Sequence, residues 1–386
     1  MTATPRNFQY LHGITTKTNA GDAVVCTLQD IDTGETKLKI IRNPKRNFYV
    51  TKKKYQHTHE SKKEYAPMSE LDTFTVENSR LRSALLEQLG YSLYSKVPLK
   101  VLLNSPYVYG ADIDIDVLVK QAYLNATEKV TSTFSMGAVD IETSVTKNGE
   151  IILMSYVDQN LNSYCAMLES FSEDYTLKHI DNLCKTSIDK MCESVNEDGA
   201  KVLKKKPLGT TTLFKAEDEI SLLKWIFDKI HKTKPSFVGV WNVDFDMPCI
   251  VERIEMLGYA AEDIICHPEV PLDCRYYKYH KDENKKVAHI SRRWHYVECA
   301  GYTQYFCAMA VFSILRTVEG VRDSYKLKET SDDILGITKL DFGEGGYAEM
   351  ETKRFDEYVA YNIVDSLLVV LLNEVTNDVT SMYCMC

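Results

Sequence analysis

The sequence has 386 residues, of which 44% are hydrophobic, and a formal net charge of −9. This apolar content is sufficient for a sizeable core and for two domains. The acidic balance disfavours a passive nucleic-acid coat, which would more often be basic. The first residues lack the apolar core of a signal peptide, and no stretch approaches the roughly 18 apolar residues of a membrane span. Eleven scattered cysteines without a CxxC pair indicate reduced thiols. We therefore expect a cytoplasmic protein without a membrane partner.

The first part of the chain, residues 1–128, is expected to form a β-rich α+β domain. Apolar residues alternate over 23–28 and 37–41 on either side of an Asp-Thr-Gly-Glu turn, which predicts a β-hairpin. Residues 76–89 predict a helix that ends at Gly90.

A basic window lies inside this part, with eight Lys and Arg residues and four interleaved aromatics over 42–65. Such a window could contact the phosphates of a template strand or of RNA, or it could be a solvated loop face. Its candidate DNA-binding residues are Lys52, Lys53 and Lys54.

The charge balance changes near residue 128. Residues 1–127 hold 17 Lys and Arg against 13 Asp and Glu, which is +4, so the remaining residues must carry −13 to give the net charge of −9. Beyond this point, expected strands alternate with expected helices, which predicts an α/β domain with a mixed sheet over 129–386. The strands are 134–141, 151–157 and 237–241, and the helices are 218–231, 247–257 and 355–374.

Three acidic segments follow one another in this second part. They are Asp140-Ile141-Glu142, Asn242-Val243-Asp244-Phe245-Asp246 and Tyr361-Asn362-Ile363-Val364-Asp365. Each segment alone is weak evidence for a metal site. The first could be a solvated strand edge, the second a helix cap, and the third a tyrosine on a helix rim. On a strand, residues two apart share a face, and on a helix residues four apart do so. Together, four acids in this order could share divalent cations, and an all-oxygen site suits Mg²⁺ or Mn²⁺.

These segments resemble the Exo I (Asp-x-Glu), Exo II (Asn-x-x-Phe-Asp) and Exo III (Tyr-x-x-x-Asp) motifs of the 3′→5′ exonuclease domain of family B DNA polymerases. Ala360 stands where the histidine subclass of such exonucleases would carry its His, which favours the tyrosine subclass. Residues 276–296 alternate around a polar turn at 282–286. They look like the hairpin that helps separate primer from template in tailed-phage enzymes. The resemblance covers about residues 130–386 and is looser before them.

The resemblance implies an RNase H-like mixed-sheet exonuclease domain that uses two Mg²⁺ or Mn²⁺ ions. It implies catalytic roles for Asp140, Glu142, Asp246, Tyr361 and Asp365, of which the four acids would hold the metals. The tyrosine would position the attacking water. The substrate would be single-stranded DNA or the 3′ end of a primer-template, and the product a 5′-nucleotide.

Two more residues, Asn242 and Phe245, are candidates to contact the terminal nucleotides. Core packing beneath the metal site is an equally good reading of Phe245.

The sequence carries no segment that resembles the palm motifs of family B polymerases. We expect the editing part of a phage-like polymerase, located in a host cytoplasm if phage-encoded, that cannot polymerise without a palm-bearing polypeptide. A sliding clamp is a further candidate partner. Apolar positions over 369–385 could dock such a partner or pack within their own domain. The alternatives are a freestanding exonuclease for repair or nucleotide salvage, and a non-catalytic scaffold or RNA-binding subunit.

Overall fold

The computed structural model describes residues 7–126, 134–281, 295–320, 322–337 and 346–385. The chain forms two compact units. One is Met1–Thr131 together with Glu269–Arg275, and the other is Ser132–Pro268 together with Tyr276–Cys386. The short second segment of the first unit is held there by Arg42, whose guanidinium donates to both carboxylate oxygens of Asp273 at 2.6 and 3.0 Å.

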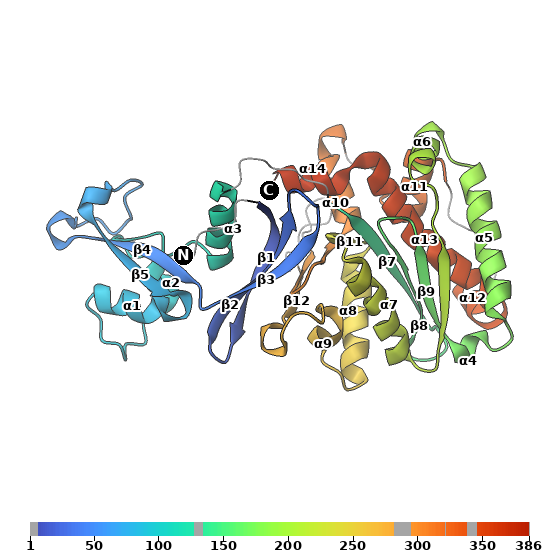
Figure 1. Ribbon diagram of the computed structural model, residues 1–386, viewed down its shortest axis with the longest axis horizontal. Coiled ribbons are helices and arrows are strands. Elements are labelled where there is room, and N and C mark those ends of the chain that lie inside the picture. Colours follow the sequence, from blue (N-terminus) through green and yellow to red (C-terminus); the bar gives the residue numbers. More distant parts are fainter. Residues whose placement is uncertain (1–6, 127–133, 282–294, 321, 338–345, 386) are drawn as a thin grey trace. The chain divides into compact units, whose positions relative to one another are not determined.

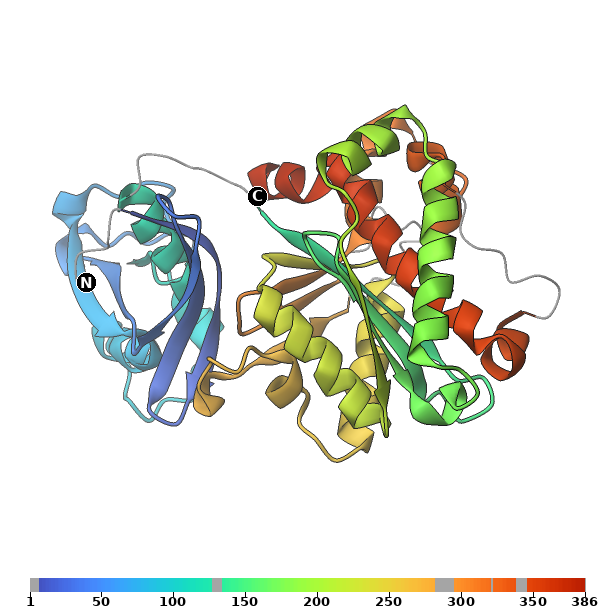
Figure 2. The same cartoon turned by 45° about the vertical axis from the view of Figure 1, so that its right-hand side comes forward.

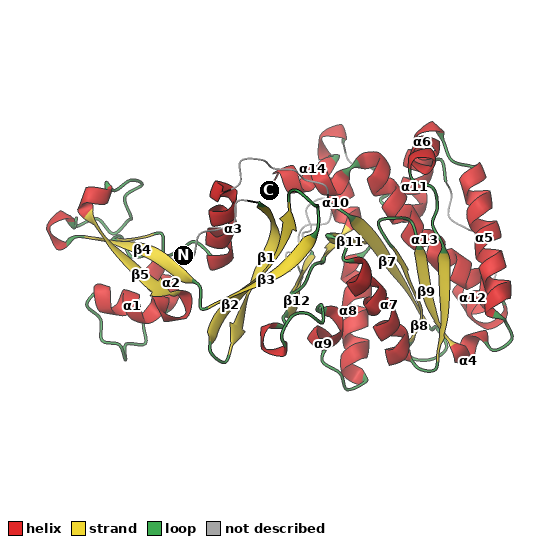
Figure 3. Cartoon of the chain, viewed as in Figure 1, coloured by secondary structure: helices red, strands yellow, loops and turns green. Residues whose placement is uncertain are grey.

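The first unit contains two three-stranded sheets with short helices beside them (Figure 3). The order in the first sheet is β1-β2-β3 and in the second β5-β4-β6. The strands are β1 (Phe8–Thr18), β2 (Gly21–Asp30), β3 (Thr36–Arg42), β4 (Lys45–Thr51), β5 (Leu71–Glu77) and β6 (Val108–Tyr109), and the helices are α1 (Leu81–Gln88), α2 (Leu99–Leu103) and α3 (Ile115–Ala126).

The predicted hairpin of this unit is confirmed, because β2 and β3 pair antiparallel with Val24 opposite Ile41. The predicted helix over 76–89 begins too early. Val76 belongs to β5 and lies opposite Arg46 of β4, and α1 starts only at Leu81. Residues 73–76 read Thr-Phe-Thr-Val, a β-branched and aromatic run that favours a strand.

The second unit is built on an eight-stranded mixed sheet with the order β10-β9-β8-β7-β11-β14-β13-β12. The expected strands appear as β7, β8 and β11, so the mixed α/β architecture is confirmed. In the middle of the sheet β7 runs parallel to β11 and antiparallel to β8. The strands are β7 (Met136–Thr143), β8 (Ile151–Val157), β9 (Ser163–Leu168), β10 (Thr211–Ala216), β11 (Phe237–Val240), β12 (Tyr277–His280), β13 (Tyr296–Cys299) and β14 (Gln304–Cys307).

Helices cover both faces of this sheet, with α7 and α8 on one face and α13 and α5 on the other (Figures 1 and 2). Successive residues of β8 show the two sides, since neighbours on a strand point in opposite directions. Ser155 donates to the Asn362 carbonyl of α13 at 2.8 Å, whereas the Tyr156 hydroxyl is 2.7 Å from Thr233 Oγ1 of α7. The helices are α4 (Glu169–Ser172), α5 (Leu177–Glu193), α6 (Glu197–Lys205), α7 (Glu219–Thr233), α8 (Val243–Met256), α9 (Ala261–Ile265), α10 (Ala308–Leu315), α11 (Leu327–Leu335), α12 (Gly346–Lys353), α13 (Phe355–Thr376) and α14 (Asp378–Met385).

Helix α13 is the central core helix of the second unit. Its 22 residues meet the length and hydropathy of a membrane span, contrary to what the sequence pattern indicated, but 78% of the apolar window is buried inside the protein. Leu371, Leu372 and Val379 are also buried. The suggestion that the apolar positions after 369 form a docking surface is therefore wrong for these residues, because they pack within their own unit.

The first strand of the hairpin predicted over 276–296 appears as β12 at the edge of the sheet, but its antiparallel partner β13 begins only at Tyr296, so the described second strand extends beyond the predicted range. Tyr277 of β12 lies opposite Cys299 of β13, and His280 lies opposite Tyr296. The predicted polar turn at 282–286 lies outside the described residues.

Candidate active site

The first acidic segment lies on the central strand β7. Asp140 stands opposite Ser155 of β8, so it faces the side on which α13 lies. Glu142 points to the same face, because it is two residues further along the strand. The pairing of β7 with β8 is irregular between Glu142 and Thr143. An irregularity of this kind locally interrupts the ladder beside the two acids.

Helix α13 supplies the donors that hold these acids. The amide Nδ2 of Asn362 donates to Asp140 Oδ2 at 2.8 Å, and the hydroxyl of Tyr358 donates to Glu142 Oε2 at 2.7 Å. Tyr358 and Asn362 are four residues apart and so share one helix face. Both donors are neutral, so neither hydrogen bond cancels the charge of its carboxylate.

Tyr361 lies among three of the predicted acids. It is 5% exposed, and burial raises the pKa of its phenol. The negative charges of Asp365, Glu142 and Asp140 raise that pKa further. The phenol is therefore a protonated hydrogen-bond donor. The structure thus brings together four of the five predicted catalytic residues, from the middle strand of the sheet and from its longest helix.

The second acidic segment follows the neighbouring strand β11. Val240 of β11 stands opposite Val139 of β7, and the two strands are parallel. The segment 242–246 therefore follows β11 beside the part of β7 that carries Asp140 and Glu142. Asp246 is buried in the first turn of α8. The pKa of the Cys249 thiol is raised to about 11, mainly by burial of that thiol and further by the negative charge of Asp246.

The structure corrects two expectations for this segment. Helix α8 begins at Val243, four residues before the predicted start at Met247, so both Asp244 and Asp246 lie in its first turn. Phe245 is 54% exposed, which contradicts the core-packing alternative and leaves contact with the terminal nucleotides as a prediction. Asn242 is exposed at the N-cap position, where its side chain makes no capping hydrogen bond.

Among the described residues, no group of three or more His, Cys, Asp or Glu side chains has an arrangement that could hold a metal ion. The chemistry of the site nevertheless fits a hard divalent cation, because its acids offer only oxygen ligands. Asn362 and Tyr358 each contact one oxygen of these two carboxylates, so the donors that orient the acids are uncharged.

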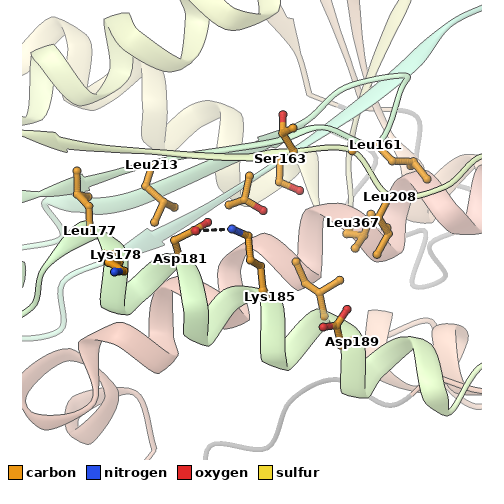
Figure 4. Close-up of a pocket in the computed structure, with 14 residues that line it drawn as sticks. Leu161, Ser163, Leu177, Lys178, Asp181, Lys185, Asp189, Leu208, Leu213 and Leu367 are labelled. Carbon is orange, nitrogen blue, oxygen red and sulfur yellow. Dashed lines mark hydrogen bonds and ion pairs between the residues drawn. The ribbon is translucent and has the colours of Figure 1, made fainter.

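A cavity of about 610 Å³ lies elsewhere in the second unit, between α5 and the strands β9 and β10 (Figure 4). Leu367 of α13 lines it, but none of the predicted acids does. Leu367 is two positions after Asp365, which is more than half a helical turn, so the two side chains lie on different faces of α13. The Lys185 ammonium donates to Asp181 at 2.5 Å in its wall.

The three candidate lysines of the first unit have different surroundings. Lys53 and Lys54 are exposed in a short 3₁₀ turn, and the Lys54 ammonium lies 4.6 Å from the ring centroid of Tyr55. The ammonium of Lys52 instead donates to the Ser69 carbonyl at 2.8 Å, which fastens the loop.

Residues 105–304 match the family model described as DNA polymerase family B, exonuclease domain. This range is more than half of the 386 residues. The chain belongs to this family. Its mixed α/β sheet fits the RNase H-like fold, and membership of the family supports a 3′→5′ exonuclease role. No curated protein matches the sequence.

The matched range of the polymerase exonuclease family includes Asp140, Glu142 and Asp246 but ends before α13. The grouping of Tyr361 and Asp365 with the β7 acids therefore rests on the structure. The sequence reasoning missed Tyr358 and Asn362. Tyr358 precedes Tyr361 by three residues, which is a helical spacing that could have identified it.

Proposed function

We propose that this chain is the proofreading part of a family B replicative DNA polymerase of the tailed-phage type. It would hydrolyse the terminal phosphodiester of single-stranded 3′ ends and release 5′-nucleotides. One observation supports this proposal above others. A single face of α13 donates hydrogen bonds to both acids of β7 and places Tyr361 within the field of Asp140, Glu142 and Asp365.

In this proposal, the acids Asp140, Glu142, Asp246 and Asp365 would hold two magnesium or manganese ions. The ions would act as Lewis acids that generate a hydroxide nucleophile and offset the charge on the phosphate. The other residues prepare the site. Tyr358 and Asn362 fix the two β7 carboxylates, and such fixed orientation reduces the reorganisation needed during the reaction.

The nucleic acid would be held by the neighbouring residues. Tyr361 stays protonated and would hold the attacking water through its hydroxyl. Phe245, which is exposed beside Asp246, would stack on the terminal base, since aromatic faces bind single-stranded bases without sequence preference. Asn242 would contact the same terminal nucleotides from the N-cap of α8.

The double variant Asp140→Ala with Glu142→Ala tests this function. It should abolish Mg²⁺-dependent degradation of a single-stranded oligonucleotide, because the site loses both carboxylates of β7. A matched control is Glu173→Ala, which removes an exposed acid outside the predicted site. Degradation by the double variant at the wild-type rate would refute the assignment. A folded wild-type protein without nuclease activity would favour the scaffold alternative.

We also propose that the exposed lysines of the first unit contact a nucleic-acid backbone. The logarithm of the affinity falls as the logarithm of the salt concentration rises. Neutralising Lys53 and Lys54 together should make this slope shallower by about 2, since each phosphate contact contributes about 1 to its magnitude. Lys52→Ala should change the slope less, because its ammonium is bonded to the Ser69 carbonyl. An unchanged slope in the double variant would leave this surface as an ordinary solvated face.

A palm-bearing polypeptide is the partner that we propose, and a sliding clamp is a second candidate. Purification of the chain from its native source should bring down a larger polypeptide that carries the polymerase palm motifs. Recovery of an active chain without such a partner would instead favour the freestanding exonuclease.

A further inference from the structure

Asp244 lies in the acidic segment of α8 but has partners of a different kind from those of the β7 acids. Its Oδ1 accepts a hydrogen bond from the Tyr279 hydroxyl at 2.7 Å and forms an ion pair with the Lys281 ammonium at 3.1 Å. Asp244 is thus already matched by a cation of the protein itself.

Both partners lie at the C-terminal end of β12, which pairs with β13 at the edge of the sheet. Tyr279 is in β12, and Lys281 follows that strand directly. The ring of Tyr279 also stacks on the ring of His295, which directly precedes β13, with centroids 6.3 Å apart. A second cross-strand stack, between His280 and Tyr296, has centroids 4.5 Å apart. Asp244 therefore contacts a strand pair that is stabilised by two cross-strand ring stacks.

The first turn of α8 needs such an anchor. Asn242 provides no side-chain cap, so the usual stabilisation of a helix start is missing. Pro248 lies inside the helix and has no N–H, so the carbonyl four residues before it, that of Asp244, cannot receive the ordinary helical hydrogen bond. This weakened turn carries Phe245, which is 54% exposed.

We propose that Tyr279 and Lys281 are positioning residues that act through Asp244. They hold the first turn of α8 so that Phe245 is presented to the terminal base of a single-stranded 3′ end. This inference rests on the proposed exonuclease function for its substrate. It assigns Asp244 to anchoring and leaves metal binding to Asp246.

Steady-state kinetics on a single-stranded oligonucleotide test the anchor. Tyr279→Phe combined with Lys281→Met should raise KM about fivefold and should change kcat less than about twofold. The effect on KM is smaller than that expected for complete loss of one stacked base, because the ring of Phe245 is still present. Phe245→Ala should raise KM at least as much. The anchor variants should add nothing further in the Phe245→Ala background, because they act through the same ring. Lys281→Arg should keep the wild-type KM.

The matched control is Tyr296→Phe, which removes a hydroxyl from the same strand pair without touching Asp244. A fall in kcat at unchanged KM, or effects that add to those of Phe245→Ala, would overturn the proposal.

Amide hydrogen exchange separates this inference from the proposed function. The anchor variants should speed exchange at Phe245 and Asp246, whose N–H groups both donate to the Asn242 carbonyl, while the amides of α13 stay as in the wild type. If the wild type lacks nuclease activity but the variants show this faster exchange, the function fails and the anchor stands. Unchanged exchange in the first turn of α8 would refute the anchor whatever the activity.

Discussion

At the scale of single residues, the site depends on the hydrogen-bond donors that orient the carboxylates of β7. Tyr358 and Asn362 each donate to one acid of β7, and both are neutral. Burial raises the pKa of Tyr358, and the charge of Glu142 raises it further, so this hydroxyl remains a donor. Groups that orient metal ligands in this way are usually worth a factor of about 10–100 in metal affinity or activity.

Tyr358→Phe should therefore raise the Mg²⁺ concentration for half-maximal activity by about tenfold, because Glu142 loses its fixed orientation. The measurement is a magnesium titration of oligonucleotide degradation. Tyr175→Phe is a suitable control, since its hydroxyl donates to the Lys353 carbonyl and not to a site acid. An unchanged titration curve for Tyr358→Phe would show that this hydroxyl does not orient a metal ligand.

At the scale of elements, α12 is tied to the turn that follows β7. The buried carboxylate of Glu351 accepts hydrogen bonds from Ser144 Oγ at 2.6 Å and from the Val145 amide at 2.8 Å, and a further one from Thr146. Burial acts to raise the pKa of Glu351, but these hydrogen bonds outweigh it and leave the pKa below its usual range.

This lowered pKa predicts how stability depends on pH. A carboxyl whose pKa is lower in the folded state adds stability above its unfolded pKa, near 4.3, and loses it as pH falls through the folded value. Glu351→Gln should therefore be less stable than the wild type at pH 7, and the difference should shrink below about pH 4. Urea unfolding at several pH values measures it. A difference that is independent of pH would contradict the role of the charge.

Periodic elements were predictable from the sequence, and their ends less so. The runs at 151–157 and 355–374 are continuous and apolar, and they match β8 and α13 closely. The start of α8 was predicted too late, at Met247, because Asp246 could serve as its N-cap, whereas the helix already begins at Val243. The strand spacing of Asp140 and Glu142 and the helix spacing of Tyr361 and Asp365 predicted only that each pair shares a face, and the resemblance to the exonuclease motifs joined the two pairs. Tyr279 could not, since its contact with Asp244 spans 35 residues.

At the scale of the whole molecule, the central claim is that a family B exonuclease site removes nucleotides from 3′ ends. An oligonucleotide labelled at its 3′-terminal nucleotide measures this most directly, with the wild type compared with Asp140→Ala combined with Glu142→Ala. The account predicts that the first labelled product of the wild type is a single 5′-nucleotide, formed only with a divalent cation, and that the double variant forms none. Labelled fragments of several nucleotides, or equal product from the double variant, would contradict it.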